Sequence, residues 1–158
     1  MKRICSFIGV CVIVLCNYIL PVNAATNESL ATQKSVTYFE DGSYVVTFIV
    51  DEDLNDSIGC FSTMQTRTST KYTHYYNAQD VLQFSVAINA TFTYNGKTAQ
   101  ATRATYGYKI SSPNWQFISG DKKCEGATAT ATCSFRYMNR YYKTLSSSLT
   151  CAPDGTLS

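Results

Sequence analysis

The chain has 158 residues, of which 13 are lysine or arginine and 11 are aspartate or glutamate. This length suits a single domain with one hydrophobic core. The near balance of charge argues against a nucleic-acid-binding protein, which needs a net basic surface, so we expect no nucleic-acid partner.

The N-terminus has the pattern of a secretion signal. Two basic residues precede an apolar run that ends at Pro21, and small residues up to Ala24 suit cleavage by signal peptidase after that position. A membrane anchor is the alternative, but the run is short for a membrane span and polar residues follow it closely. We therefore expect residues 1–24 to be a cleaved signal and the mature protein to be secreted without a stable membrane anchor. Residues 25–33 show no periodicity and are predicted to be a flexible lead.

The first strands are predicted to form a hairpin. Residues 35–50 contain two β-rich runs joined at Asp41-Gly42, a pair suited to a tight turn with positive φ at both positions. The acidic stretch Asp51–Asp56 follows and is predicted to be an exposed loop. Its alternating oxygen-bearing side chains resemble part of a calcium loop, but the required glycine and final glutamate are missing. We expect a solvated loop, and cation binding by it stays open.

The longest predicted strand covers residues 81–94, after short strands at 58–64 and 71–76. Every second residue from Leu82 to Tyr94 is apolar, and most residues between them are polar. This period of two indicates a strand with one buried face and one solvent-facing side.

A second hairpin is predicted at Asn95-Gly96. A two-residue turn there places Arg103 opposite Ile88 on the buried face, whereas one further residue places Ala104 there. We therefore predict Ala104 opposite Ile88, with a three-residue loop or a bulge at the turn.

Two features are predicted between this hairpin and the next. Residues 115–118 are expected to form a short strand, and residues 119–126 a polar connection. Residues 127–137 then alternate between alanine or another core residue and a polar residue, which predicts a half-buried strand. Its small alanines require a bulky residue above them, and Trp115 is the candidate.

The last hairpin is predicted to have residues 138–140 as its loop. This loop places Leu145 opposite Cys133 and Leu149 opposite Ala129, all on the buried face.

Four cysteines remain after removal of the signal, and an even number in an exported chain predicts two disulfides. Their spacing and the single histidine argue against zinc. In the predicted hairpin Cys133 and Cys151 are about 20 Å apart at about 3.3 Å per residue, too far for a disulfide. We predict Cys124–Cys151 and Cys60–Cys133, with other pairings open.

The many short strands and turn signals predict an all-β fold. We expect residues 34–158 to form one antiparallel β-sandwich with Greek-key, immunoglobulin-like topology. A small up-and-down β-barrel is the alternative.

Several of these segments resemble a group of small secreted all-β proteins of Gram-positive bacteria. The resemblance covers about residues 85–158 and is carried by the run from Ala90 to Gly96, by Trp115, by the Ala/Thr strand that ends at Phe135, and by residues 149–158. It implies a sandwich fold and an extracellular location. The group has no assigned activity, so the resemblance implies no site.

Two groups of side chains form a candidate binding surface. Exposed tyrosines between polar groups suit stacking on sugar rings or contact with a protein, although tyrosine is also common in half-buried strands. His74 has no nucleophile motif near it in sequence, so catalysis through it is not expected. The groups are Tyr72, His74 and Tyr76 on one strand face, and Arg136, Arg140 and Tyr142 on the outer side of the last hairpin.

We therefore expect a secreted, non-catalytic binding module with a glycan or protein partner and without a cofactor. A secreted effector or toxin is the first alternative, because a small disulfide-bonded domain suits that role, and a secreted hydrolase is the second.

Overall fold

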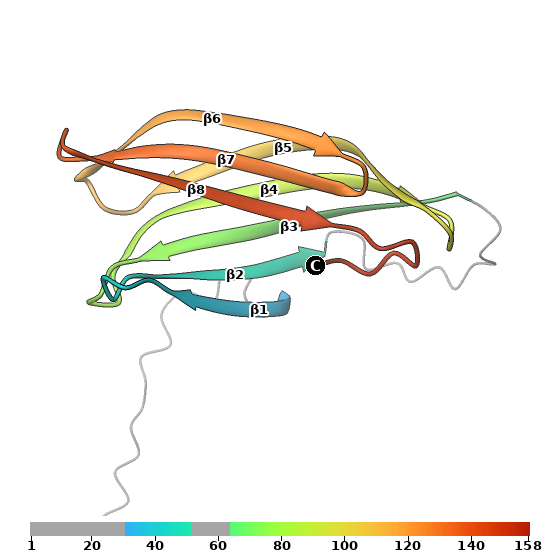
Figure 1. Ribbon diagram of the computed structural model, residues 1–158, viewed down its shortest axis with the longest axis horizontal. Coiled ribbons are helices and arrows are strands. Elements are labelled where there is room, and N and C mark those ends of the chain that lie inside the picture. Colours follow the sequence, from blue (N-terminus) through green and yellow to red (C-terminus); the bar gives the residue numbers. More distant parts are fainter. Residues whose placement is uncertain (1–30, 52–63) are drawn as a thin grey trace, which may run out of the picture.

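The computed structural model of the protein describes residues 31–51 and 64–158, which form eight strands in two sheets (Figure 1). No helix long and apolar enough to cross a membrane occurs in these residues. The expected signal and most of the strand expected at 58–64 lie outside them. The strands are β1 (Ala31–Tyr38), β2 (Tyr44–Asp51), β3 (Gln65–Tyr76), β4 (Leu82–Tyr94), β5 (Ala99–Ile110), β6 (Trp115–Glu125), β7 (Thr128–Tyr137) and β8 (Tyr141–Thr150).

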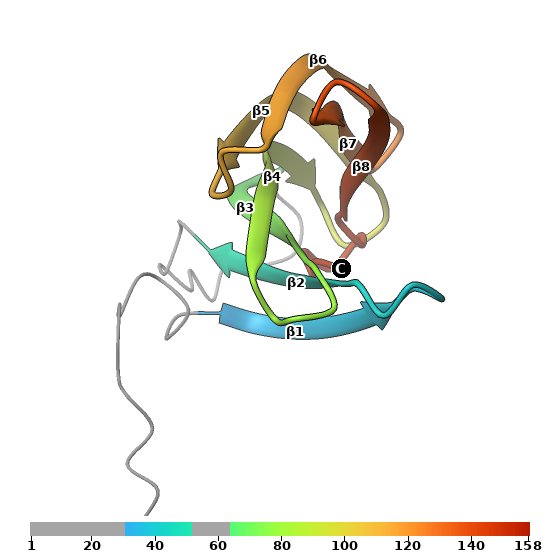
Figure 2. The ribbon, with the colours of Figure 1, turned by 90° about the vertical axis from the view of Figure 1, so that its left-hand side faces the viewer.

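The two sheets form an antiparallel β-sandwich, which confirms the predicted fold class. Sheet A has the strand order β1-β2-β3-β4-β5, and sheet B has the order β6-β7-β8. Neither sheet closes into a barrel, so the barrel alternative does not apply. Sheet B packs against β3, β4 and β5, while β1 and β2 lie at the far edge of sheet A (Figure 2).

The predicted Greek-key topology is not the one that the described strands adopt. In both sheets every strand lies beside its neighbour in sequence, so each sheet is a meander. The chain passes from one sheet to the other between β5 and β6. A Greek key instead needs a strand that returns beside an earlier one through a long connection.

The inward side of β4 is fully buried from Phe84 to Phe92, as its alternating sequence predicts. The strand has a neighbouring strand on each side, and sheet B covers its inner face, so the inward row of side chains is shielded from water. Burial of this row is therefore the main hydrophobic contribution of sheet A to the core. Its five inaccessible side chains are Phe84, Val86, Ile88, Ala90 and Phe92.

The rings of Phe84 and Phe135 join the two sheets. They stack with centroids 4.0 Å apart, and neither is accessible to solvent. Trp115 flanks this contact with its ring 4.8 Å from that of Phe84. Its indole N–H donates to Gln83 Oε1 over 3.1 Å, so the polar end of the tryptophan is satisfied as well.

Trp115 does not lie over the small residues of β7, where we expected it. It pairs with Tyr137 at one end of that strand, whereas Ala129 and Ala131 pair with the opposite end of β6. The expectation failed because residues 119–125 are not a connection but continue β6 along the whole of β7. Their side chains are mostly exposed, so the sequence there lacks the alternation of a half-buried strand.

The hairpin of β4 and β5 has the predicted faces but not the predicted register. Ala104 is buried and Arg103 is exposed, as expected. However, Ala104 lies opposite Ala90 and not opposite Ile88. A four-residue loop at 95–98 and a bulge further along β5 shift the pairing beyond the bulge by two positions, which leaves Ala104 and the residues after it on their expected faces. Before the bulge the shift is one position, so Ala101 faces the core, which the predicted register did not place there.

The other two hairpins were predicted at the correct places. In the last one, Leu145 lies opposite Cys133 across the 138–140 loop, as predicted. The first one has a five-residue connection at 39–43, in which Gly42 has a φ of 78° and Asp41 has no positive φ. The predicted two-residue turn is therefore wrong, and β1 begins earlier than the predicted domain boundary.

The contact between the sheets predicts a large effect of truncating Phe84. Phe84→Ala removes a stacked, inaccessible ring and leaves a cavity, so we expect the free energy of unfolding to fall by about 3–5 kcal/mol. Urea denaturation followed by circular dichroism measures this change. The control Tyr141→Ala removes a ring that is 67% exposed and should change stability by less than about 0.5 kcal/mol. Equal effects of the two substitutions would contradict the inter-sheet role of Phe84.

A charged cluster closes the end of β2. Arg67 Nε donates to Asp51 Oδ1 over 3.0 Å, its Nη2 bonds the other carboxylate oxygen, and Ser69 Oγ donates to the same carboxylate. Arg67 Nη1 also donates to the Gly155 carbonyl over 2.7 Å, which attaches the C-terminal turn to sheet A. Burial alone raises the pKa of Asp51, but the bonds from Arg67 and Ser69 outweigh it, so this pKa lies below its ordinary value.

This cluster predicts acid-sensitive stability. The pKa of Asp51 is lower in the folded than in the unfolded state. The ionised carboxylate therefore stabilises the fold at every pH above its unfolded-state pKa, and this stabilisation is lost as the pH falls through its folded-state pKa. Asp51→Asn should cost about 1–3 kcal/mol at pH 7 and flatten this part of the stability–pH curve. The control Glu125→Gln breaks an exposed ion pair with Lys123 and should cost less than about 0.5 kcal/mol. Denaturation at several pH values tests both, and an Asp51→Asn curve parallel to the native one would contradict the assignment.

Candidate functional site

Six aromatic rings lie side by side on the outer face of sheet A, and we call them the aromatic face. Their positions alternate along β1, β2 and β3, so all six side chains point away from sheet B. Neighbouring ring centroids are 4.9 to 6.4 Å apart, which makes the rings one continuous surface. The six are Tyr38, Tyr44, Phe48, Tyr72, His74 and Tyr76.

The degree of exposure changes across the aromatic face. Tyr38 at the edge is 72% exposed, Tyr44, Tyr72 and Tyr76 are half-buried, and Phe48 is buried beneath its neighbours. Phe48 stacks on Tyr72 at 5.2 Å, and Tyr44 stacks on Tyr76 at 4.9 Å. Stacking of this kind fixes the ring positions before any ligand arrives, which lowers the entropy cost of binding.

His74 is part of this surface. Its ring contacts Phe48 edge-on at 5.0 Å and lies within 6.4 Å of the rings of Tyr72 and Tyr76. In this position the imidazole belongs to a row of rings on the outer face of sheet A.

A shallow groove of about 280 Å³ continues the aromatic face toward β5, and we call it the outer groove. Ala87 and Gly107 lie opposite each other on β4 and β5 and form its floor, so backbone is reachable there. Tyr72 forms one wall, and Lys109 stands on the β5 side. At the other end of the aromatic face, desolvation and then the neighbouring Asp80 carboxylate raise the pKa of Tyr44, so its hydroxyl stays protonated. Rings, backbone and charged groups of both signs thus share one face.

The predicted binding surface is divided between the two sheets. Tyr72, His74 and Tyr76 come together as expected, but Arg136 and Tyr142 pair on the outer face of sheet B, and Arg140 lies in the loop beside them. That face is otherwise a ladder of hydroxyl pairs, and Arg136 donates to Gln116 over 2.9 Å. The two outer faces of a sandwich point in opposite directions, so these groups form separate surfaces.

The rest of the aromatic face was not predicted from the sequence. Tyr38, Tyr44 and Phe48 belong to two other strands, and only the pairing register brings them beside Tyr72. A usable signal existed, because the β1–β2 hairpin was predicted and its tyrosines flank the turn. The sequence around Gly107 gives no indication of a groove, because the floor of the outer groove can be recognised only when the strand opposite Gly107 is known.

The described cysteines form no disulfide. Cys124 is exposed, Cys133 and Cys151 are buried, and all three carry free thiols, so the predicted Cys124–Cys151 bond is absent. Cys124 lies on the solvent-exposed strand β6. Cys151 is buried, and its backbone pairs with that of Leu157 in an isolated antiparallel β-bridge. Cys60, the expected partner of Cys133, lies outside the described residues.

The acidic loop is mostly outside the described residues too. Its first member, Asp51, binds Arg67 and Ser69, so its carboxylate is already engaged. Over residues 31–51 and 64–158, no three histidine, cysteine or acidic side chains gather in a metal-binding group.

The structure predicts an order of thiol reactivity in the reduced protein. Iodoacetamide should modify Cys124 first, because burial both shields Cys133 and Cys151 and raises the pKa of their thiols. Timed alkylation followed by peptide mass spectrometry gives the order, and the same reaction in guanidinium is the control in which the differences disappear. Modification of Cys133 as fast as Cys124 would contradict the structure. A peptide map of the unreduced protein shows directly whether any two cysteines are joined.

No protein-family model, curated protein or solved structure matches this chain. The resemblance to secreted proteins of Gram-positive bacteria therefore stays a prediction.

Proposed function

We propose that this protein is a secreted, non-catalytic binding module that holds a glycan chain on the aromatic face and in the outer groove. The observation that supports this most is the continuity of the six rings with the groove. Pyranose rings present flat C–H faces that pack on aromatic side chains, and their hydroxyls need polar partners at the edges. Export rests on the N-terminal signal pattern.

The shape of the outer groove favours an extended ligand. At about 280 Å³ it is near the lower end of small-molecule sites, and it lies open on the sheet face. Such a groove holds one unit of a chain while the adjoining rings contact the next units. Ser85 and Lys109 at its edge provide hydrogen-bond donors for sugar hydroxyls. A protein partner is the other outcome that the experiment below distinguishes.

Filling the outer groove is the sharpest test. A Cβ at Gly107 meets only the Ala87 Cβ, at 4.0 Å, and the backbone φ there is not positive, so a side chain at this position starts without a clash at Cβ. Valine also suits a strand better than glycine, so we expect unchanged or higher stability. Binding to an insoluble polysaccharide that retains the native protein should fall at least tenfold, which is about 1.4 kcal/mol. Gly107→Ala should have an intermediate effect.

The assay is a pull-down of native and variant protein on cellulose, chitin and purified bacterial cell wall. Tyr72→Ala should also weaken binding at least tenfold, because it removes the ring shared by the aromatic face and the outer groove. The matched control Tyr142→Ala removes a tyrosine that is 68% exposed on the opposite sheet and should bind like the native protein. The glycan proposal would be overturned if the native protein were retained on none of these polysaccharides, or if Gly107→Val bound as well as the native protein. If the native protein instead captured a protein and Gly107→Val did not, a protein partner would be favoured.

A further inference from the structure

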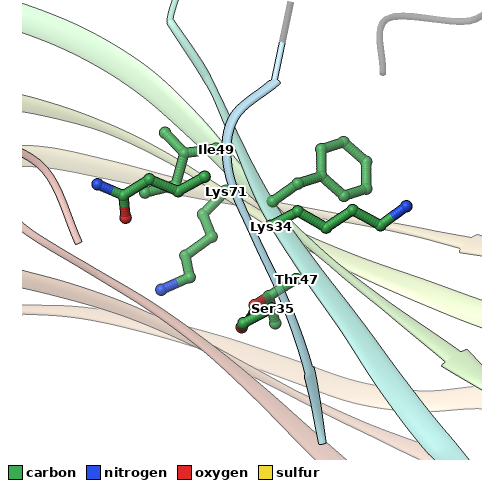
Figure 3. Close-up of a pocket in the computed structure, with 7 residues that line it drawn as sticks. Lys34, Ser35, Thr47, Ile49 and Lys71 are labelled. Carbon is green, nitrogen blue, oxygen red and sulfur yellow. Dashed lines mark hydrogen bonds between the residues drawn. The ribbon is translucent and has the colours of Figure 1, made fainter. Parts of the chain in front are cut away.

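A second groove lies on the inner side of sheet A, where sheet B does not reach. Sheet A has five strands and sheet B three, and the contacts of β1 are mainly with β2. The inner positions of β1 and β2 therefore border an open groove of about 340 Å³, which we call the inner groove (Figure 3). Its inner wall is formed by Gln33, Ser35, Thr47, Ile49 and Lys71.

Lys71 is the distinctive residue of the inner groove. It occupies an inward position of β3, between Ile49 of β2 and Ile88 of β4. The side chain is half-buried, and desolvation lowers the pKa of its ammonium group. Figure 3 shows it extending into the groove, with Lys34 directed to the other side of β1.

No carboxylate of the described residues forms an ion pair with Lys71. The two ion pairs in this part of the chain are Arg67–Asp51 and Lys123–Glu125. Asp51 is the nearest acid along the β2–β3 ladder, two positions from the residue opposite Lys71, and Arg67 and Ser69 already bind it. A half-buried cation without a counter-ion is costly, because burial removes water without replacing its favourable interaction.

Polar groups next to Lys71 are arranged to contact a hydroxylated ligand. Ser35 Oγ and Thr47 Oγ1 are 2.6 Å apart, so one hydroxyl donates to the other and the second proton is free to donate outward. Gln33 donates its amide N–H to the Leu157 carbonyl over 2.8 Å, which fixes the side chain and leaves its oxygen as an acceptor. Ile49 adds an apolar surface.

We propose that the inner groove binds a hydroxylated organic carboxylate, with the chemistry of a hexuronic acid, whose carboxylate pairs with Lys71. The carboxylate supplies a counter-charge that no described residue provides there, the ligand hydroxyls meet the Ser35–Thr47 pair, and C–H groups face Ile49. A single ammonium without arginine matches one negative charge better than the greater charge of phosphate or sulfate. This site is independent of the aromatic face, so each proposal stands or fails by itself.

The test is a titration of the full chain with glucuronate, followed by calorimetry and by the NMR signals of the lysine side chains. Native protein should bind glucuronate and not glucose, and the Lys71 signals should shift. Lys71→Met keeps the length of the side chain and removes its charge, so binding should fall at least tenfold. The matched control Lys122→Met removes an exposed lysine of β6 that lines neither groove and should leave glucuronate binding unchanged.

Three results would overturn the proposal. The first is that Lys71→Met binds glucuronate as tightly as the native protein does. The other two are that the native protein binds glucose as tightly as glucuronate, or sulfate as tightly or more tightly. Thermal unfolding shows whether Lys71→Met is folded, and we expect it to be at least as stable as the native protein because it removes an unpaired charge. Ser35→Ala provides a second variant that keeps the charge: it should weaken glucuronate binding without affecting acetate, which carries the carboxylate but no hydroxyls.

Discussion

The contact of β4 with β7 through the rings of Phe84 and Phe135 is the constraint on which the rest of the structure depends. Each ring lies on a strand that has neighbours on both sides, and this contact fixes where one sheet lies on the other. Because sheet B has two fewer strands and packs over β3, β4 and β5, it does not cover β1 and β2. The polar inner residues of β1 and the half-buried position of Lys71 follow from that mismatch, as does the open space of the inner groove.

The outer side of sheet A follows from a different condition. A strand whose inner residues are apolar is free to carry any residue on its outer side, and most sandwich strands carry small polar residues there. Sheet B does so, with its ladder of threonine and serine pairs. Sheet A instead places six rings on three adjacent strands, where cross-strand contact orders them. Stacked rings partly hide one another from water, which lowers the cost of an aromatic surface on the outside of the sheet and leaves the ring edges and upper faces for contact.

The sequence predicted strand faces well because burial repeats every two residues, and it predicted neighbours poorly for the same reason. A shift of two positions leaves every side chain on its correct face, so no burial argument separates Ala104 opposite Ile88 from Ala104 opposite Ala90. The last hairpin was predicted fully because its three-residue loop allowed only one register.

The exposed strand β6 was missed over 119–125 because polar residues there carry no alternation. Half of the aromatic face was found, since Tyr72, His74 and Tyr76 share one strand, and the other half depends on strand pairing. Arg136 and Tyr142 lie on the outer side of the last hairpin as predicted, but that side is the other outer face of the sandwich.

Two cations on the inner side of β3 show why Lys71 calls for a functional explanation. Arg67 lies four residues earlier on the same face, and the chain satisfies it with the Asp51 carboxylate and the Gly155 carbonyl. The hydrogen bonds of Arg67 therefore explain its presence on structural grounds alone, because they attach two distant segments to sheet A. Lys71 lies between two isoleucines, forms no ion pair with a described carboxylate, and is desolvated on its own strand. Methionine or leucine at that position would pack equally well and avoid the cost of the charge. A residue that lowers stability where an apolar one would raise it is typical of a binding site, where the missing partner comes from outside the chain.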